Sequence, residues 1–164
     1  MSYREPSYAM FPTEEYLARV EKARKLMDES GIDALLLTAK ENVIYFSGIR
    51  TIGWNSKHRP MGIVVPRDNS KPVMMILPES LFDVAYHSSW IDELRPWGGW
   101  RIADADPDPL TGFLEACKSL GVLNGTIAIE RGYGQRIAMS QDDFEDLTGR
   151  LSSAKFVDVG SLMW

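Results

Sequence analysis

Apolar residues recur along this chain with two spacings, and their alternation predicts helices and strands in turn. The first helical face, within residues 13–30, is formed by Tyr16, Leu17, Val20, Ala23 and Met27. Thr13 is expected to cap this helix, and Gly31 supplies the left-handed conformation that ends many helices. The next segment, Ile32 to Thr38, is short and strongly apolar and follows the helix directly, which predicts a buried strand.

The middle of the chain predicts a β-hairpin. Two apolar runs, Met61 to Val65 and Val73 to Leu77, flank the sequence PRDNSKP, which is a strong turn signal. Before them, Glu41 to Phe46 could form a short helix or a turn that ends at Gly48.

The rest of the chain continues the alternation and sets the fold class. Helices are expected over Pro78 to Trp90, Leu110 to Leu120 and Ser140 to Leu151, and strands over Ile91 to Trp97, Thr126 to Ile129 and Lys155 to Val159. Alternating helices and strands indicate an α/β domain, and the hairpin makes its central sheet mixed.

Composition restricts the partners and the compartment. The 164 residues suffice for one domain, and a net charge of −5 argues against nucleic acid as a general partner. The lone Cys117 cannot form an intrachain disulfide and is expected to be a buried core thiol. The N-terminal residues lack the apolar core of a signal peptide, and no apolar run is long enough for a membrane span. We therefore expect a cytoplasmic protein without membrane partners.

Candidate chemistry is sparse. The two histidines, His58 and His87, lie far apart in sequence without other metal ligands at a recognisable spacing. Ser47 precedes a glycine but is not part of a nucleophile elbow, so we interpret it as part of a chain reversal. Neither a catalytic residue nor a metal ligand is therefore predicted within these residues.

The loop between Gly48 and Met61 is the exception. It places Trp54 close to Lys57, His58 and Arg59, and an arginine among such neighbours suits a bidentate grip on a carboxylate. From the residues alone, a substrate-binding loop and an ordinary solvated loop are equally favoured.

The order of these segments resembles a known family. The helix that ends at Gly31 is followed by the strand IDALLLT, the motif ENVIYFSG, the loop, and the hairpin GIVVPRDNSKPVMMILPES. This order resembles the N-terminal domain of the creatinase, prolidase and aminopeptidase P hydrolases, over about residues 13 to 160. The individual motifs are short, so their order and spacing carry the resemblance.

The resemblance implies a three-layer α/β/α domain with a mixed sheet of ribonuclease H-like motif. It divides the chain into an N-terminal arm (residues 1–12), this domain (13–160) and the start of a linker (161–164). The catalytic domain would follow as a separate C-terminal part. In peptidase relatives that part would bind two divalent metal ions, such as Mn, Co or Zn, whereas creatinase-like relatives would use a histidine base.

The same resemblance implies what the domain does. It would form a homodimer, contact the C-terminal catalytic domain of the same protein, and cap the site of a small-molecule or peptide substrate that carries a carboxylate. Arg59 stands three residues before Gly62, where creatinase-like relatives place a carboxylate-binding arginine; His58 and Trp54 are the other candidate contacts. The alternative is a standalone protein-binding module of the same fold, because one inactive relative of this architecture binds proteins.

Overall fold

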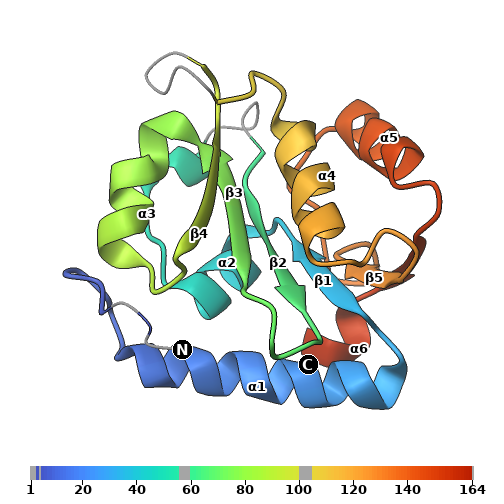
Figure 1. The fold of residues 1–164 in the computed structure, drawn as a ribbon, viewed down its shortest axis with the longest axis horizontal. Helices are drawn as coiled ribbons and strands as arrows, with labels where there is room; N and C mark the ends of the chain where they lie inside the picture. Colours follow the sequence, from blue (N-terminus) through green and yellow to red (C-terminus); the bar gives the residue numbers. More distant parts are fainter. Residues whose placement is uncertain (1–2, 4, 56–59, 100–104, 164) are drawn as a thin grey trace.

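A computed structural model of the chain describes residues 3, 5–55, 60–99 and 105–163. Six strands form one sheet in the order β4-β3-β2-β1-β5-β6 (Figure 1). The strands are β1 (Ala34–Leu37), β2 (Gly62–Pro66), β3 (Met74–Pro78), β4 (Glu93–Trp97), β5 (Thr126–Ile129) and β6 (Lys155–Asp158). Strand β2 runs antiparallel to both its neighbours, while the pairs β1–β5, β5–β6 and β3–β4 are parallel. The expected hairpin and mixed sheet are thereby confirmed.

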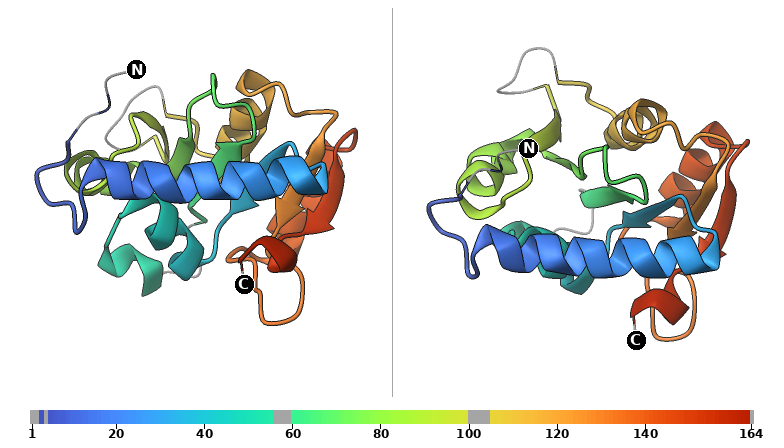
Figure 2. Two further views of the ribbon diagram at one scale, coloured as in Figure 1. Left: turned by 90° about the horizontal axis from the view of Figure 1, so that it is seen from below. Right: turned by 60° about the horizontal axis from the view of Figure 1, so that its bottom comes forward.

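Helices cover both faces of this sheet, which gives the predicted three layers (Figures 1 and 2). The helices are α1 (Thr13–Ser30), α2 (Lys40–Ser47), α3 (Phe82–Ser88), α4 (Pro109–Ser119), α5 (Gln141–Arg150) and α6 (Gly160–Met163), and two short 3-10 helices are η1 (Ile52–Asn55) and η2 (Glu79–Leu81). One hydrophobic cluster joins the sheet to α1, α2 and α3, and the other joins it to α4 and α5.

The alternation of side chains along a strand explains why β1 is apolar throughout. Leu35 and Leu37 enter the cluster beneath α1, whereas Ala34 and Leu36 enter the cluster beneath α4. Successive strand residues point to opposite faces, so a strand covered on both sides needs apolar residues at every position. The central strands β2 and β3 are likewise buried along their whole length.

Three helix boundaries test the local signals. Gly31 has φ 65° and ends α1 as expected, because glycine adopts this left-handed conformation without steric cost. The prediction of Thr13 as the N-cap is wrong: Pro12 occupies the cap position, and Thr13 is the first helical residue and is buried. At α5 the expected cap is confirmed, since the Ser140 hydroxyl accepts a hydrogen bond from the Asp143 amide.

Candidate functional site

The candidate loop lies at the edge of the sheet where β3 and β4 end and β2 begins. On its N-terminal side, η1 packs closely against η2: a Cβ added to Gly53 would lie 2.8 Å from Leu81 Cδ1. On its C-terminal side, the Trp97 indole donates a hydrogen bond to the Pro60 carbonyl at 3.1 Å. Both ends of the loop are therefore attached to the sheet edge by contacts with buried or half-buried side chains.

Trp54 is the candidate substrate residue that the structure describes. Its ring packs against the hydrophobic cluster beneath α1, and its Nε1 atom is buried without a hydrogen-bond partner among the described residues. A buried indole N–H usually has an acceptor, so the acceptor of Trp54 lies outside the described residues or in another molecule. The role of Trp54 in substrate binding stays a prediction.

The other predicted contacts, His58 and Arg59, and the neighbouring Lys57 lie outside the described residues. The structure fixes the positions on either side of them: Trp54 precedes them on η1, and Pro60 follows beside Trp97. Glu79 is buried at the same edge, and Gly98 leaves space for it, since a Cβ there would lie 3.0 Å from Glu79 Cγ.

Groups that could act as nucleophiles elsewhere are engaged or shielded. The Ser47 hydroxyl donates to the Val43 carbonyl at 2.6 Å and accepts from the Ile49 amide at 3.2 Å, within the chain reversal at Gly48. Cys117 is buried in the cluster beneath α4, and burial raises the pKa of its thiol to about 12. These observations confirm both residues as structural.

The carboxylates, His87 and Cys117 are dispersed over the described structure. Among residues 3, 5–55, 60–99 and 105–163, no three His, Cys, Asp or Glu side chains come together where they could hold a metal ion.

A buried carboxylate that the sequence reasoning missed organises the neighbouring part of the edge. Glu130 follows β5 and is fully buried. Its Oε2 accepts hydrogen bonds from the Thr38 amide (2.8 Å), the Thr38 hydroxyl (3.1 Å) and the Ala39 amide (2.8 Å). Its Oε1 accepts from Asn42 Nδ2 at 2.7 Å. Glu130 thus joins the ends of β1 and β5 to the start of α2. The available signals were a glutamate directly after an apolar strand and the asparagine of ENVIYFSG.

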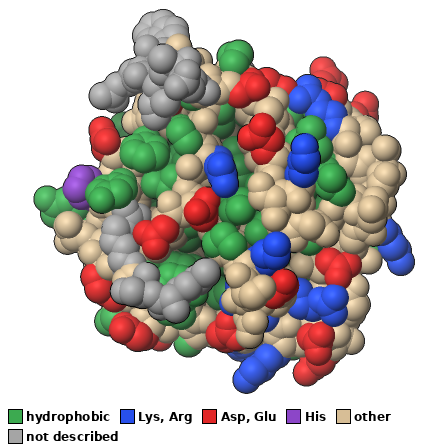
Figure 3. All heavy atoms as spheres, in the orientation of Figure 1, with side chains coloured by type: hydrophobic (Ala, Val, Ile, Leu, Met, Phe, Trp, Pro, Cys, Tyr) green, Lys and Arg blue, Asp and Glu red, His purple; other side chains and the backbone are tan. Residues whose placement is uncertain are grey.

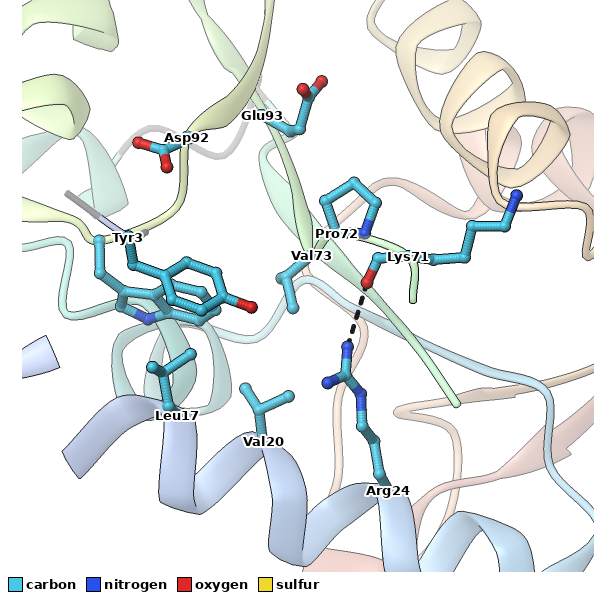
Figure 4. Close-up of a pocket in the computed structure, with 10 residues that line it drawn as sticks. Tyr3, Leu17, Val20, Arg24, Lys71, Pro72, Val73, Asp92 and Glu93 are labelled. Atoms are coloured by element: carbon cyan, nitrogen blue, oxygen red, sulfur yellow. Dashed lines mark hydrogen bonds between the residues drawn. The ribbon is translucent and has the colours of Figure 1, made fainter. Parts of the chain in front are cut away.

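A hollow at the opposite edge of the sheet offers little for a charged ligand (Figure 4). Its apolar wall includes Leu17, Val20 and Val73. Figure 4 shows the Lys71 side chain extending away from this wall, while Arg24 donates to the Lys71 carbonyl at 3.2 Å. Both cations are therefore poorly placed to receive an anion within the hollow.

The charged surface and the helices were also part of the predicted character of the chain. On the face in Figure 3, both acidic and basic side chains are exposed. In the described part of the chain, no helix combines the length and the apolar character needed to cross a membrane.

Comparison with known proteins defines the class. The profile of the Creatinase/Prolidase N-terminal domain matches residues 19–164, so the chain belongs to this family. An uncharacterized hydrolase/peptidase, y4tL, from Sinorhizobium fredii is 25% identical over 157 residues, which cover 94% of this chain. The predicted family is thereby confirmed.

Solved structures share the fold. The match to a dipeptidase from Pyrococcus horikoshii has a TM-score of 0.65 and 22% identity, and it covers 88% of this chain and 35% of the dipeptidase. The match to dipeptidase PepE from Mycobacterium ulcerans has a TM-score of 0.67 and 18% identity, and it covers 93% of this chain and 36% of PepE. The match to an Xaa-Pro aminopeptidase chain from Streptococcus pyogenes has a TM-score of 0.63 and 16% identity, and it covers 92% of this chain and 98% of that chain.

The chain is much shorter than most of these proteins. It spans 38% of the Sinorhizobium relative and about 35% of the two dipeptidases. The shared part is the N-terminal domain that the family profile describes.

Proposed function

We propose that this chain is the non-catalytic N-terminal part of a hydrolase that cleaves C–N bonds, of the Xaa-Pro peptidase or creatinase-like type. In this role it caps the substrate site, contributes to a homodimer and contacts the C-terminal catalytic domain of the same protein. The observation that carries the proposal is the family match over residues 19–164 in a chain that spans only 38% of its hydrolase/peptidase relative. A cytoplasmic location is part of the same proposal.

The substrate contacts in this proposal come from the loop at the sheet edge. Arg59 grips the carboxylate of a small-molecule or peptide substrate, with His58 and Trp54 beside it. The unpartnered Nε1 of Trp54 supports a role for that residue, because it is a buried donor without an acceptor among the described residues. Two divalent metal ions (Mn, Co or Zn) would belong to the catalytic domain of a peptidase parent.

The first test uses the isolated chain. Purified protein supplied with Mn²⁺, Co²⁺ or Zn²⁺ should hydrolyse neither Xaa-Pro dipeptides nor creatine. Turnover by the isolated chain that Arg59→Ala abolishes would contradict a non-catalytic role.

The second test uses the chain joined to its catalytic part. Arg59→Ala should lower kcat/KM for carboxylate substrates. The corresponding loss of transition-state stabilisation should be about 2–5 kcal/mol, as expected when one partner of a buried charge pair is removed. Arg59→Lys is the control that keeps the charge, and a substrate with an amide in place of its carboxylate should respond much less to either change. Equal kcat and KM for wild type and Arg59→Ala would remove Arg59 from the site.

A second candidate function is a standalone protein-binding module of the same fold. The Streptococcus pyogenes chain, which is matched over 98% of its length, shows that a solved chain of almost the same extent has this fold, as a standalone module would require. An open reading frame that stops after Trp164 would support the module. A downstream continuation with a set of metal ligands or a histidine base would support the hydrolase.

A further inference from the structure

The loop that follows β5, residues 131–139, exposes three large side chains to solvent. Tyr133 has a relative exposure of 101%, and Arg131 and Arg136 are also exposed. Figure 2 shows the loop as an orange segment projecting beside α6. A fully exposed tyrosine near two arginines has the composition of the residues that dominate binding energy at protein interfaces.

The backbone of this loop is held in place although Arg131, Tyr133 and Arg136 are exposed. The Gly132 amide donates to Asp158 Oδ1 at 2.7 Å, and the Gln135 amide donates to the Gly132 carbonyl at 3.1 Å. The Ala138 amide donates to the Thr38 hydroxyl at 2.8 Å, which in turn donates to the buried Glu130. Because the backbone is already ordered, a partner would bind with a smaller loss of conformational entropy.

The charges of this region are unpaired. The ion-paired arginines of the described chain are Arg19, Arg24, Arg67, Arg95 and Arg150. By contrast, Arg131 and Arg136 have no acidic partner in the described part of the chain, and neither has Glu41 a basic one. Arg136 and Glu41 line the same hollow, together with Ala39, Asn42 and Gln135. One surface therefore carries both an unpaired cation and an unpaired anion.

A surface of this kind is complementary to itself. In a twofold interface each contact occurs twice, so a residue i on one copy meets j on the other while j meets i. We propose that the 131–136 loop and this hollow form a twofold interface between two copies of the chain, with Arg136 facing Glu41 of the second copy. Tyr133 of each copy enters the hollow of the other. This inference rests on the dimerisation part of the proposed function and names its surface.

Sedimentation equilibrium of the 164-residue chain over a series of concentrations tests the proposal. Wild type should show a monomer–dimer equilibrium. Tyr133→Ala should raise the dimer dissociation constant about 30-fold, the effect of losing about 1 kcal/mol at each of the two symmetry-related Tyr133 contacts. The matched control is Ile52→Ala, which removes another exposed apolar side chain at the edge near Trp54 and should leave the dissociation constant unchanged.

Charge reversal gives the sharper test. Arg136→Glu and Glu41→Arg should each weaken the dimer at least about 10-fold, because each places like charges opposite one another. The double variant Arg136→Glu/Glu41→Arg restores both pairs in a twofold dimer and should recover most of the wild-type affinity. Arg50→Glu, at another exposed arginine, is the charge control.

Several outcomes would overturn the proposal. These are a monomer at every concentration, a dimer that survives Tyr133→Ala and both single reversals, or a double variant as weak as either single one. Circular dichroism and the midpoint of denaturation establish that each variant is folded. The capping role would be unaffected by such a failure, since it is tested separately through Arg59.

Discussion

Two loops leave the same edge of the sheet and are fixed there by different forces. The loop before β2 is attached through two tryptophans: Trp54 packs against the hydrophobic core, and Trp97 donates a hydrogen bond to the Pro60 carbonyl. The loop after β5 is attached by carboxylates, in which Glu130 accepts four hydrogen bonds and Asp158 holds the Gly132 amide.

The difference has a physical consequence. A substitution that removes apolar contacts lowers the free energy of unfolding in proportion to the buried area that is lost. A substitution that removes a buried carboxylate leaves several hydrogen-bond donors without a partner, which costs more. We therefore expect the loop after β5 to be more sensitive to single substitutions, although its side chains are more exposed.

The largest effect is expected at Glu130. Glu130→Ala leaves the Thr38 and Ala39 amides and the Asn42 side chain without their acceptor, and should lower the free energy of unfolding by about 3 kcal/mol or more. Glu130→Gln should cost less, about 1–2 kcal/mol, because one acceptor oxygen remains. Urea denaturation measures both, with Glu29→Gln on the exposed end of α1 as the control. A loss for Glu130→Ala no larger than that of the control would reverse the ranking of the two loops.

Glycine 132 tests how closely Asp158 holds the same loop. A Cβ at this position would overlap the Asp158 carboxylate, so Gly132→Ala must displace that carboxylate and should cost about 2 kcal/mol. Gly149 is the matched control, because it lies inside α5 with nothing within 4 Å of an added Cβ. Gly149→Ala should stabilise the protein by about 0.5–1 kcal/mol. Thermal or urea denaturation that gives both variants the same sign would refute the close approach at Gly132.

The aromatic edge should respond less, and unequally at its two tryptophans. Trp97→Phe removes the hydrogen bond to the Pro60 carbonyl and should cost about 1–2 kcal/mol, whereas Trp54→Phe removes a donor without a partner and should cost less. Denaturation of the two variants under one set of conditions gives the order. A larger loss for Trp54→Phe would show that its Nε1 has an acceptor after all.

Sequence reasoning succeeded where a signal is local. The turn PRDNSKP between two apolar runs predicted the β2–β3 hairpin, and Gly31 marked the end of α1, because each depends on neighbouring residues. Thr13 was assigned wrongly as a cap because its burial depends on the packed core, which a local pattern does not reveal.

The same distinction between local and long-range signals applies to the candidate site. Trp54 could be selected from sequence as an aromatic residue in a polar loop. The Glu130 network could not, because its donors are 88 to 92 residues away and meet it only once β1 and β5 have paired.

The smallest effect on stability is expected at a partly exposed polar contact between Asp108 and Arg150. Asp108 caps α4 by accepting from the Leu110 amide at 2.9 Å, and it is paired with Arg150 of α5. Burial acts to raise the pKa of Asp108, but hydrogen bonds from Arg150, Leu110 and Thr111 outweigh it and lower the pKa below its ordinary value. A carboxyl with a lowered pKa stabilises the fold above its unfolded pKa, and that stability is lost as the pH falls through the folded value.

Asp108→Asn keeps a capping oxygen and removes the charge, so the expected effect is small. At neutral pH the variant should lose less than about 1 kcal/mol, because the pair is partly exposed and screened by solvent. The difference from wild type should shrink as the pH falls below the ordinary aspartate pKa, and it should disappear once Asp108 is protonated in the folded chain as well. Urea denaturation of both proteins at neutral and acid pH measures this. A difference that persists at acid pH would mean that Asp108 acts through its shape and capping geometry, and the stabilising effect of carboxylates would then be confined to the buried Glu130.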